Sequence, residues 1–306
     1  MQTLDLSTLA LGQKVKGMLE PVLGHPVEIP YFVLRGAKTG PTLLVTAGVH
    51  GAEYASIEAA NRLVQFGLEG LSGTLIVLPI VNPLGFFARS IYVNPIDGKN
   101  LNRMFPGKAD GSFAERLAHW LTETFITQAD AYIDLHGGDL VEALTPFTIF
   151  QKNHVPSQEL AEVFGIELLV ESDSDIMTFT AGAARGVPSI LAEASGQGLW
   201  PEEEVERLRS GVERVMQHLG MLSGNPHSKT SRLLTEFAWL SSEHSGLWYP
   251  QASAGDKVQS GQGVGQVKTL LGEVLQEAVS PVNGTVLFSV SSLAINQGDP
   301  LLGIGA

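Results

Sequence analysis

Short, continuous apolar runs alternate with segments of helical periodicity through the first 220 residues of the chain. The apolar runs are expected to form strands, and they occupy residues 27–35, 42–48, 74–82, 131–138, 147–150, 166–170 and 187–194. The segments with helical spacing are residues 53–68, 113–129 and 201–220. Unbroken apolar strands that alternate with helices are typical of an α/β sheet covered on both faces. Such sheets bind ligands at the carboxyl ends of their strands, so we expect a functional site at that edge.

The pattern changes near residue 230, where helical periodicity ends and short strand-like runs separated by glycines begin. A Gly-Asp pair occurs in residues 254–267 and is echoed weakly in residues 297–306. These features predict a small all-β domain, a flattened barrel built from two similar halves. We therefore expect an α/β domain at residues 1–228 and a β-rich domain at residues 229–306.

Charge and composition narrow the classes of function. The 306 residues carry a formal net charge of −13, so general binding to nucleic acid or to an anionic membrane is not expected. The absence of cysteine excludes disulfides, thiolate metal sites and a cysteine nucleophile. The first 20 residues do not resemble a signal peptide, and no apolar run approaches the ~20 residues of a membrane helix. The sequence predicts a soluble, cytoplasmic protein.

Two histidines, His50 and His136, follow apolar runs and precede glycines. Glu53 comes three residues after His50, and residues with this spacing at the start of a helix share one face. A catalytic zinc site uses three protein ligands of this chemistry and leaves a fourth position for water. We expect His136 to be the third ligand, with Asp134 on the same face of its strand as a hydrogen-bond partner for an imidazole. The alternative is an ordinary structural role for each histidine.

A long irregular segment, residues 82–107, follows one of the predicted strands, and we call it the arm. Long irregular segments inside an α/β domain are usually functional or disordered, and this one is rich in Phe, Ile and Leu. Residues 88–108 contain four basic side chains and one acidic side chain, a balance of +3 in an acidic chain. The segment is either a solvated basic loop or a carboxylate-binding element, because an arginine fork matches a carboxylate.

Three motifs in order, "GVHGAE", "DGKNLNRMFPG" and "DLHGG", resemble the succinylglutamate desuccinylase/aspartoacylase family, part of the wider zinc carboxypeptidase-like hydrolases. The motifs fall within residues 40–200, and the β-rich tail suits the C-terminal domain of that family. The resemblance implies a mixed, mostly parallel sheet flanked by helices, followed by an all-β barrel-sandwich domain of the lipoyl/biotinyl type. It also implies one Zn²⁺ per chain, with His50, Glu53 and His136 as its ligands.

The same resemblance implies roles for further side chains. Asn102 and Arg103 match the pair that binds the carboxylate of the substrate, and Arg89 matches an arginine that polarises the scissile carbonyl. Glu193, at the end of an apolar run, matches the general base. Arg185 is a candidate for contact with a second acidic group of the substrate, or else a surface residue.

Two other carboxylates, Glu142 and Glu171, are rivals for the role of general base.

The expected activity is zinc-dependent hydrolysis of the amide bond of an N-acyl amino acid or related small carboxylate. The alternatives are a metallocarboxypeptidase acting on a small peptide, and a non-catalytic binding or carrier protein. A carrier would present a modified lysine at a hairpin tip, and Lys268 in "QVKTLLGEV" lacks the usual flanking residues. The expected partner is a small anionic substrate, and self-association into a homo-oligomer is left open.

Overall fold

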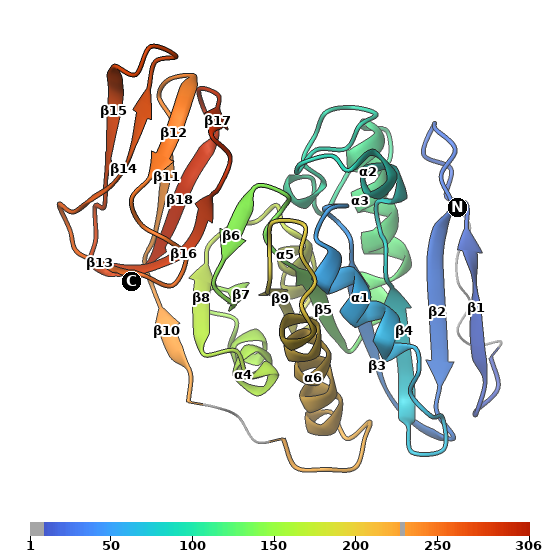
Figure 1. The fold of residues 1–306 in the computed structure, drawn as a ribbon. Helices are drawn as coiled ribbons and strands as arrows, with labels where there is room; N and C mark the ends of the chain where they lie inside the picture. The colour runs from blue at the N-terminus through green and yellow to red at the C-terminus, as the bar shows by residue number, and fades with distance from the viewer. Residues whose placement is uncertain (1–8, 227–229) are drawn as a thin grey trace.

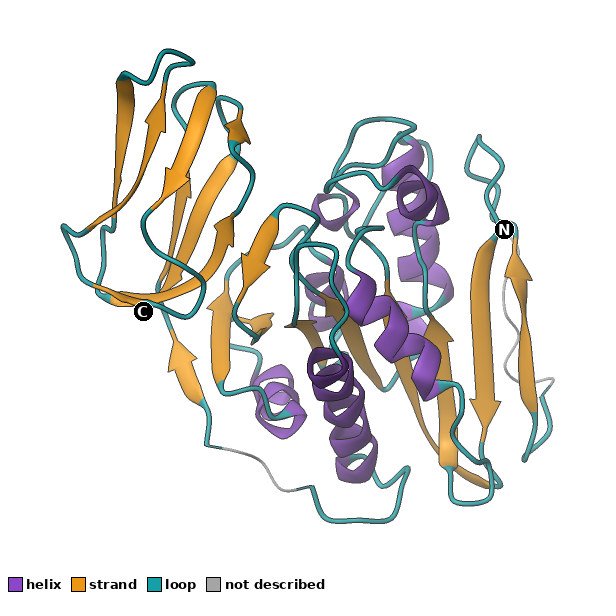
Figure 2. Ribbon diagram, viewed as in Figure 1, coloured by secondary structure: helices purple, strands orange, loops and turns teal. Residues whose placement is uncertain are grey.

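The computed structural model describes residues 9–226 and 230–306. The chain forms a large α/β lobe and a separate C-terminal lobe of strands, as Figures 1 and 2 show. Within the described residues, none of the helices is both long and apolar enough to cross a membrane.

A nine-stranded sheet runs through the α/β lobe, in the order β1-β2-β4-β3-β5-β9-β7-β8-β10. Its strands are β1 (Lys14–Leu19), β2 (Ile29–Arg35), β3 (Lys38–Ala47), β4 (Ser72–Leu78), β5 (Ala131–His136), β7 (Phe147–Gln151), β8 (Leu168–Ser172), β9 (Ser189–Glu193) and β10 (Arg232–Leu234). The pairs β1–β2, β2–β4 and β7–β9 are antiparallel, and the other five pairs are parallel. The predicted mixed, mostly parallel sheet is therefore confirmed.

Helices cover both faces of this sheet. They are α1 (Tyr54–Leu63), α2 (Pro83–Ala88), α3 (Phe113–Thr124), α4 (Val155–Phe164), α5 (Thr178–Ala183) and α6 (Glu202–His218), with short 3-10 turns η2 (Leu101–Arg103) and η3 (Ile126–Gln128). One buried cluster joins the sheet to α1, α4 and α6, and a second joins the opposite face to α3 and α5.

Strand β3 shows how an unbroken apolar run serves both faces of the sheet. Leu43 and Val45 belong to the first cluster and Leu44 to the second, because successive side chains of a strand point to opposite faces. Each such buried side chain stabilises the fold by about 1.5–3 kcal/mol.

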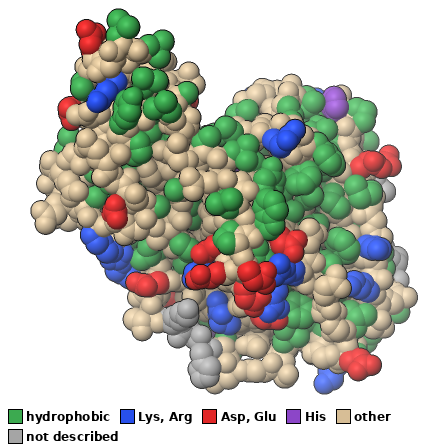
Figure 3. Space-filling model, viewed as in Figure 1, with side chains coloured by type: hydrophobic (Ala, Val, Ile, Leu, Met, Phe, Trp, Pro, Cys, Tyr) green, Lys and Arg blue, Asp and Glu red, His purple; other side chains and the backbone are tan. Residues whose placement is uncertain are grey.

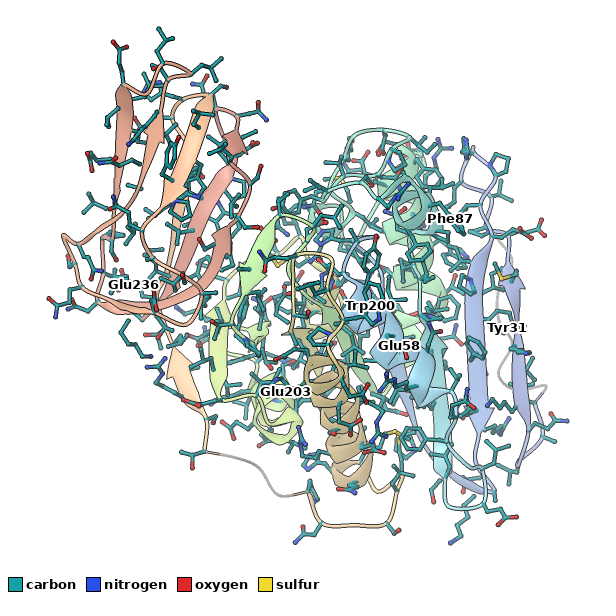
Figure 4. The ribbon with its side chains drawn as sticks, viewed as in Figure 1. Tyr31, Glu58, Phe87, Trp200, Glu203 and Glu236 are labelled. Carbon is teal, nitrogen blue, oxygen red and sulfur yellow. The ribbon has the colours of Figure 1, made fainter. Side chains whose placement is uncertain are left out.

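Helices α1 and α6 are also joined at the surface. Arg62 donates to Glu58 at 2.8 Å within α1 and to Glu202 of α6 at 2.5 Å. Figure 4 labels Glu58 and Glu203 on these two helices, and Figure 3 shows the mixed acidic and basic patch that they form on this face. Exposed ion pairs of this kind usually contribute about 0–1 kcal/mol each, so the apolar cluster beneath dominates the packing.

The C-terminal lobe is all-β, as predicted, and consists of two antiparallel sheets. Its strands are β11 (Phe237–Ser241), β12 (Gly246–Pro250), β13 (Lys257–Val258), β14 (Gly263–Lys268), β15 (Val274–Val279), β16 (Gly284–Val290), β17 (Ala294–Ile295) and β18 (Pro300–Gly305). One sheet has the order β11-β18-β16-β13 and the other β15-β14-β12-β17. Trp248 is buried between them, and its indole N–H donates to the carbonyl of Val290 at 3.0 Å.

The repeated Gly-Asp pair forms the same turn twice. Asp256 accepts the amide of Ser253 at 2.8 Å, and Asp299 accepts the amide of Asn296 at 2.8 Å. The preceding glycines have φ values of 94° and 90°, in the left-handed region that glycine tolerates. Strands β13 and β18 each begin just after this turn, so the echo in the sequence reflects two equivalent strand starts.

The two lobes exchange one short strand each. β10 follows the predicted boundary but extends the large sheet beside β8. β6 (Glu142–Leu144) precedes the boundary but pairs with β16 of the C-terminal lobe. The predicted boundary between residues 228 and 229 itself lies outside the described residues, whereas the strand exchange shows that the two lobes share an interface.

Candidate metal centre and active site

The turn between β3 and α1 carries the first two candidate ligands. Gly48 has a φ of 63°, and a Cβ on Gly51 would lie 2.1 Å from the backbone nitrogen of Phe86, so glycine is required at both positions. His50 and Glu53 project from this turn and are buried. Glu53 is the N-cap residue of α1, but its side chain makes no capping hydrogen bond, which leaves the carboxylate directed at the histidines.

The carboxylate of Glu53 lies between two imidazoles. Its Oε1 is 2.7 Å from Nδ1 of His50, and its Oε2 is 3.0 Å from Nδ1 of His136. One nitrogen or oxygen from each of the three side chains lies within 4.8 Å of the others. His136 is the last residue of β5, whereas the sequence placed it just past a strand end. The structure thus brings together the three residues predicted as ligands.

The remaining nitrogen of each imidazole has a hydrogen-bond acceptor. Nε2 of His136 donates to Asp134 at 2.8 Å, and Asp134 in turn accepts the hydroxyl of Thr46 at 2.5 Å. Nε2 of His50 donates to the side-chain oxygen of Asn100 at 2.9 Å. These bonds direct Nδ1 of both rings toward Glu53, as is usual for metal-binding histidines. The role expected for Asp134 is confirmed, but Asn100 was not predicted.

Burial and neighbouring charges have opposing effects on the pKa values of His136 and Glu53. Burial alone would lower the pKa of His136, but the carboxylates of Asp134 and Glu53 outweigh it and raise that pKa well above the usual range. Burial would raise the pKa of Glu53, but His136 and His50 lower it to about 2. The imidazoles and the carboxylates thus stabilise one another's charged forms. Glu53 Oε2 is buried and faces Nδ1 of His136 at 3.0 Å, but it accepts no hydrogen bond of good geometry from the described residues, an arrangement that suits a ligand of a divalent cation.

Glu193 lies on the strand next to His136. β5 and β9 are parallel, and the register pairs His136 directly with Glu193. Oε2 of Glu193 is buried and has no hydrogen-bond partner in the described part of the chain. Burial and the neighbouring carboxylates, including Glu53, raise the pKa of Glu193 well above its usual range, against the opposing effect of His136. A carboxylate in this state is suited to accept and release a proton.

The arm places two donors near these groups. Asn102 is buried, and its side-chain oxygen accepts the amide of Thr178 at 3.0 Å, which leaves the amide NH₂ without a partner among the described residues. Arg103 donates to the carbonyl of Asn102 at 2.8 Å. Burial lowers the pKa of Arg103, and Glu193 partly offsets this effect, so the guanidinium lies within electrostatic reach of Glu193. The arm is thus a structured element that carries a partly desolvated cation.

The other two candidate arginines are exposed. Arg89 ends α2 with a φ of 52°, and within the described chain no polar contact joins its side chain to the histidines. Arg185 pairs with Glu123 of α3 at 3.0 Å and precedes the amino end of β9, whereas Glu193 ends that strand. A five-residue strand spans about 16 Å, so Arg185 lies at the opposite edge of the sheet. Its position supports a surface role and not contact with the substrate.

The rival carboxylates differ in position. Glu171 lies on β8, 3.8 Å from the ammonium of Lys152. Glu142 lies close to the site, but its Oε1 accepts the hydroxyl of Tyr92 at 2.6 Å. The backbone amide of Tyr92 donates to Asp139 at 2.8 Å. This second group beside the site was not predicted, because its members come from the arm and from the segment after β5.

The fold and the site define a class: α/β proteins with a buried histidine–glutamate–histidine group at the carboxyl ends of a mixed sheet. The sequence model of the Succinylglutamate desuccinylase/Aspartoacylase catalytic domain matches residues 39–219, more than half of the chain, and the chain belongs to this family. The matched region contains every residue of the site described above, as the three motifs had indicated.

Similar proteins cover nearly the whole chain. The N-alpha-acetyl-L-2,4-diaminobutyric acid deacetylase of Halomonas elongata is 29% identical over 295 residues, which are 90% of this chain and 84% of the relative. A succinylglutamatedesuccinylase/aspartoacylase from Rhodobacter sphaeroides superposes with a TM-score of 0.86 at 26% identity and covers 99% of this chain and 98% of its own. The product-bound ectoine utilization protein EutE (DoeB) from Ruegeria pomeroyi gives 0.87 at 27% identity, covering 98% of each chain.

Proposed function

We propose that this protein is a zinc-dependent deacylase that hydrolyses the amide bond of a small N-acyl amino acid. The observation that carries the proposal is the convergence of His50, Glu53 and His136 beside Glu193. Membership of the family supports a deacylase, and so does the similarity to a deacetylase of an N-acetylated amino acid.

Zinc fits the residues present at this site. Nδ1 of His50, Nδ1 of His136 and the carboxylate of Glu53 form the two-nitrogen, one-carboxylate set used by catalytic zinc, and all three are buried. When bound, Zn²⁺ would supply an activated water and a Lewis acid for the amide carbonyl. Asp134 and Asn100 would hold the two imidazoles in the tautomer that leaves Nδ1 as the ligand atom.

Glu193 is the general base of this proposal. Its carboxylate would take a proton from the attacking water as the C–O bond forms. It would return that proton to the amide nitrogen as the C–N bond breaks, giving a carboxylate and an amine. The buried, unpartnered Oε2 of Glu193 and the position of this strand end beside His136 support this role.

Asn102 and Arg103 are proposed to bind the carboxylate of the substrate. The NH₂ group of Asn102 and the guanidinium of Arg103 are both donors with unused bonding capacity. A fixed carboxylate would hold the scissile carbonyl in one place, which lowers the entropic cost of the reaction. Arg89 is proposed to polarise the carbonyl, as the resemblance implies, and its exposed position means that the side chain would have to turn inward.

A panel of substrates tests the proposal. Purified protein, with zinc supplied, is incubated with N-acetyl, N-succinyl and N-formyl amino acids and with short peptides. N-acetylated diamino acids are included because of the Halomonas relative. Release of a free amino acid from the acylated compounds is expected. Cleavage of peptides alone would favour a carboxypeptidase, and tight zinc binding without any turnover would favour a binding protein.

The carrier alternative depends on Lys268. This lysine lies at the end of β14, and its ammonium sits over the ring of Tyr249, 4.8 Å from the centroid. The adjoining hairpin tip presents Leu270 and Leu271, which are 81% and 91% exposed. A lysine in a cation–π contact is less accessible to a modifying enzyme than one at a tip. The intact mass of protein from its native host should equal the sequence mass, and a lipoyl or biotinyl increment would restore the carrier hypothesis.

A further inference from the structure

Strand β6 links the α/β lobe to the C-terminal lobe. Glu142, Ala143 and Leu144 pair with Val290, Ser289 and Phe288 of β16. The backbone bonds of Ser291 to Val141 (2.7 Å) and of Thr145 to Leu287 (2.8 Å) extend the pairing at both ends. In Figure 1, β6 lies at the boundary between the two lobes. The position of Glu142 is therefore set by the C-terminal sheet as well as by its own lobe.

The side chain of Glu142 points back toward the active site. Its Oε1 accepts the hydroxyl of Tyr92 at 2.6 Å, within the range of a charge-assisted hydrogen bond. The carbonyl of Glu142 accepts the amide of Gln197 at 2.9 Å, and a Cβ on Gly196 would lie 2.1 Å from that carbonyl. The loop that follows Glu193 thus packs directly on β6.

Tyr92 connects Glu142 to the metal site. It has a φ of 57°, a conformation that is unfavourable for a non-glycine residue and is found mainly where surrounding contacts impose it. Its ring lies edge-on to the ring of His50, with 6.2 Å between centroids. The next residue, Val93, forms a β-bridge with Asn100, and Asn100 accepts the bond from Nε2 of His50.

We propose that the Tyr92–Glu142 hydrogen bond is the contact through which the C-terminal lobe fixes the arm over the metal site. Tyr92 and Glu142 are then positioning residues, and through them the C-terminal lobe helps to hold the arm at the active site. The part of this inference that concerns catalysis rests on the proposed function. The part that concerns the arm does not, because the position of the arm can be measured directly.

Tyr92→Phe removes the hydroxyl and keeps the ring beside His50. Two measurements are made on this variant. They are amide hydrogen exchange across the arm, and KM and kcat for the substrate that the wild-type protein hydrolyses. Exchange of arm residues 93–103 is expected to rise about tenfold or more, with little change in the core strands. KM is expected to rise more than kcat falls, because the loosened arm carries the carboxylate-binding residues and not the general base.

Two further variants sharpen the test. Tyr249→Phe removes a hydroxyl that makes no hydrogen bond within the described residues, and it should change neither exchange nor KM. Glu142→Gln weakens the same bond from the other side. The double variant Tyr92→Phe with Glu142→Gln should raise KM no further than the larger single change, because both substitutions act on the same hydrogen bond.

Three outcomes overturn the inference. They are unchanged arm exchange in both single variants, an equal rise in exchange throughout the protein, and additive effects on KM in the double variant. If the wild-type protein hydrolyses nothing in the panel, the proposed function fails, but the exchange experiment still tests the contact between the lobe and the arm.

Discussion

His136 and Glu193 occupy paired positions on the adjacent parallel strands β5 and β9. Because both strands end there, one candidate ligand and the candidate base leave the sheet together at its carboxyl edge. The carboxylate of Glu53, 3.0 Å from His136, approaches from the neighbouring turn. The three groups reach one site from different parts of the chain.

Glu193→Gln should keep the metal and lose turnover. The substitution removes the proton acceptor but preserves shape, and general-base catalysis is typically worth about 10²–10⁴-fold in rate. The measurement is kcat together with zinc content. Glu171→Gln is the matched control, since this rival carboxylate lies near Lys152 and away from the site. Normal turnover in Glu193→Gln would show that the base has been assigned to the wrong residue.

Arg103→Lys should raise KM by about tenfold or more, because lysine cannot reproduce the paired bonds of a guanidinium to a carboxylate. The change in kcat should be smaller. Arg185→Ala tests whether Arg185 contacts the substrate, as the sequence suggested, or has only a surface role, as its position in the structure suggests. Its guanidinium pairs with Glu123 at the far edge of the sheet, so KM should stay unchanged. A raised KM in Arg185→Ala with no change in Arg103→Lys would reverse the two assignments.

Glu115 should stabilise the metal-free protein at neutral pH, and this stabilisation should be lost as the pH falls. It accepts the amide of Ser112 and the ammonium of Lys99, both at 2.9 Å, and these contacts lower its pKa from 4.5 to about 2. A carboxylate with a lowered pKa in the folded state stabilises the fold above its ordinary pKa, and this contribution is lost as pH falls toward 2.

The melting temperature of Glu115→Gln should therefore lie below that of the wild type at pH 7, and the gap should close between pH 4.5 and pH 2. Glu69→Gln, at an exposed position, should show no such gap. A gap that is constant with pH would mean that the charge of Glu115 does not stabilise the fold.

Local patterns in the sequence were sufficient to predict the positions of many residues of this site. Unbroken apolar runs located the strands, and the glycine turns after two of them located His50, Glu53 and His136 at one edge. Strand alternation was enough to place Asp134 beside His136, where it accepts a hydrogen bond at 2.8 Å.

Long-range contacts account for what the sequence did not reveal. Asn100 contacts His50 only because the arm folds back through its bridge with Val93. The position of Glu142 depends on pairing with a strand nearly 150 residues later in the chain. Arg185 is eight residues before Glu193, but the strand between them carries the two to opposite edges. The predicted end of α1 at residue 68 was also wrong, because the helix ends at Leu63 and a turn follows at residues 64–65.

Zinc titration of chelator-treated protein, by calorimetry with metal analysis, tests whether His50, Glu53 and His136 bind one metal ion. We expect one tightly bound Zn²⁺ per chain. In His136→Ala the affinity should fall by more than about 100-fold, since even the hydrogen-bond partners of metal ligands are worth 10–100-fold. Folded wild-type protein that binds no zinc, or that binds it equally well without His136, would contradict the account.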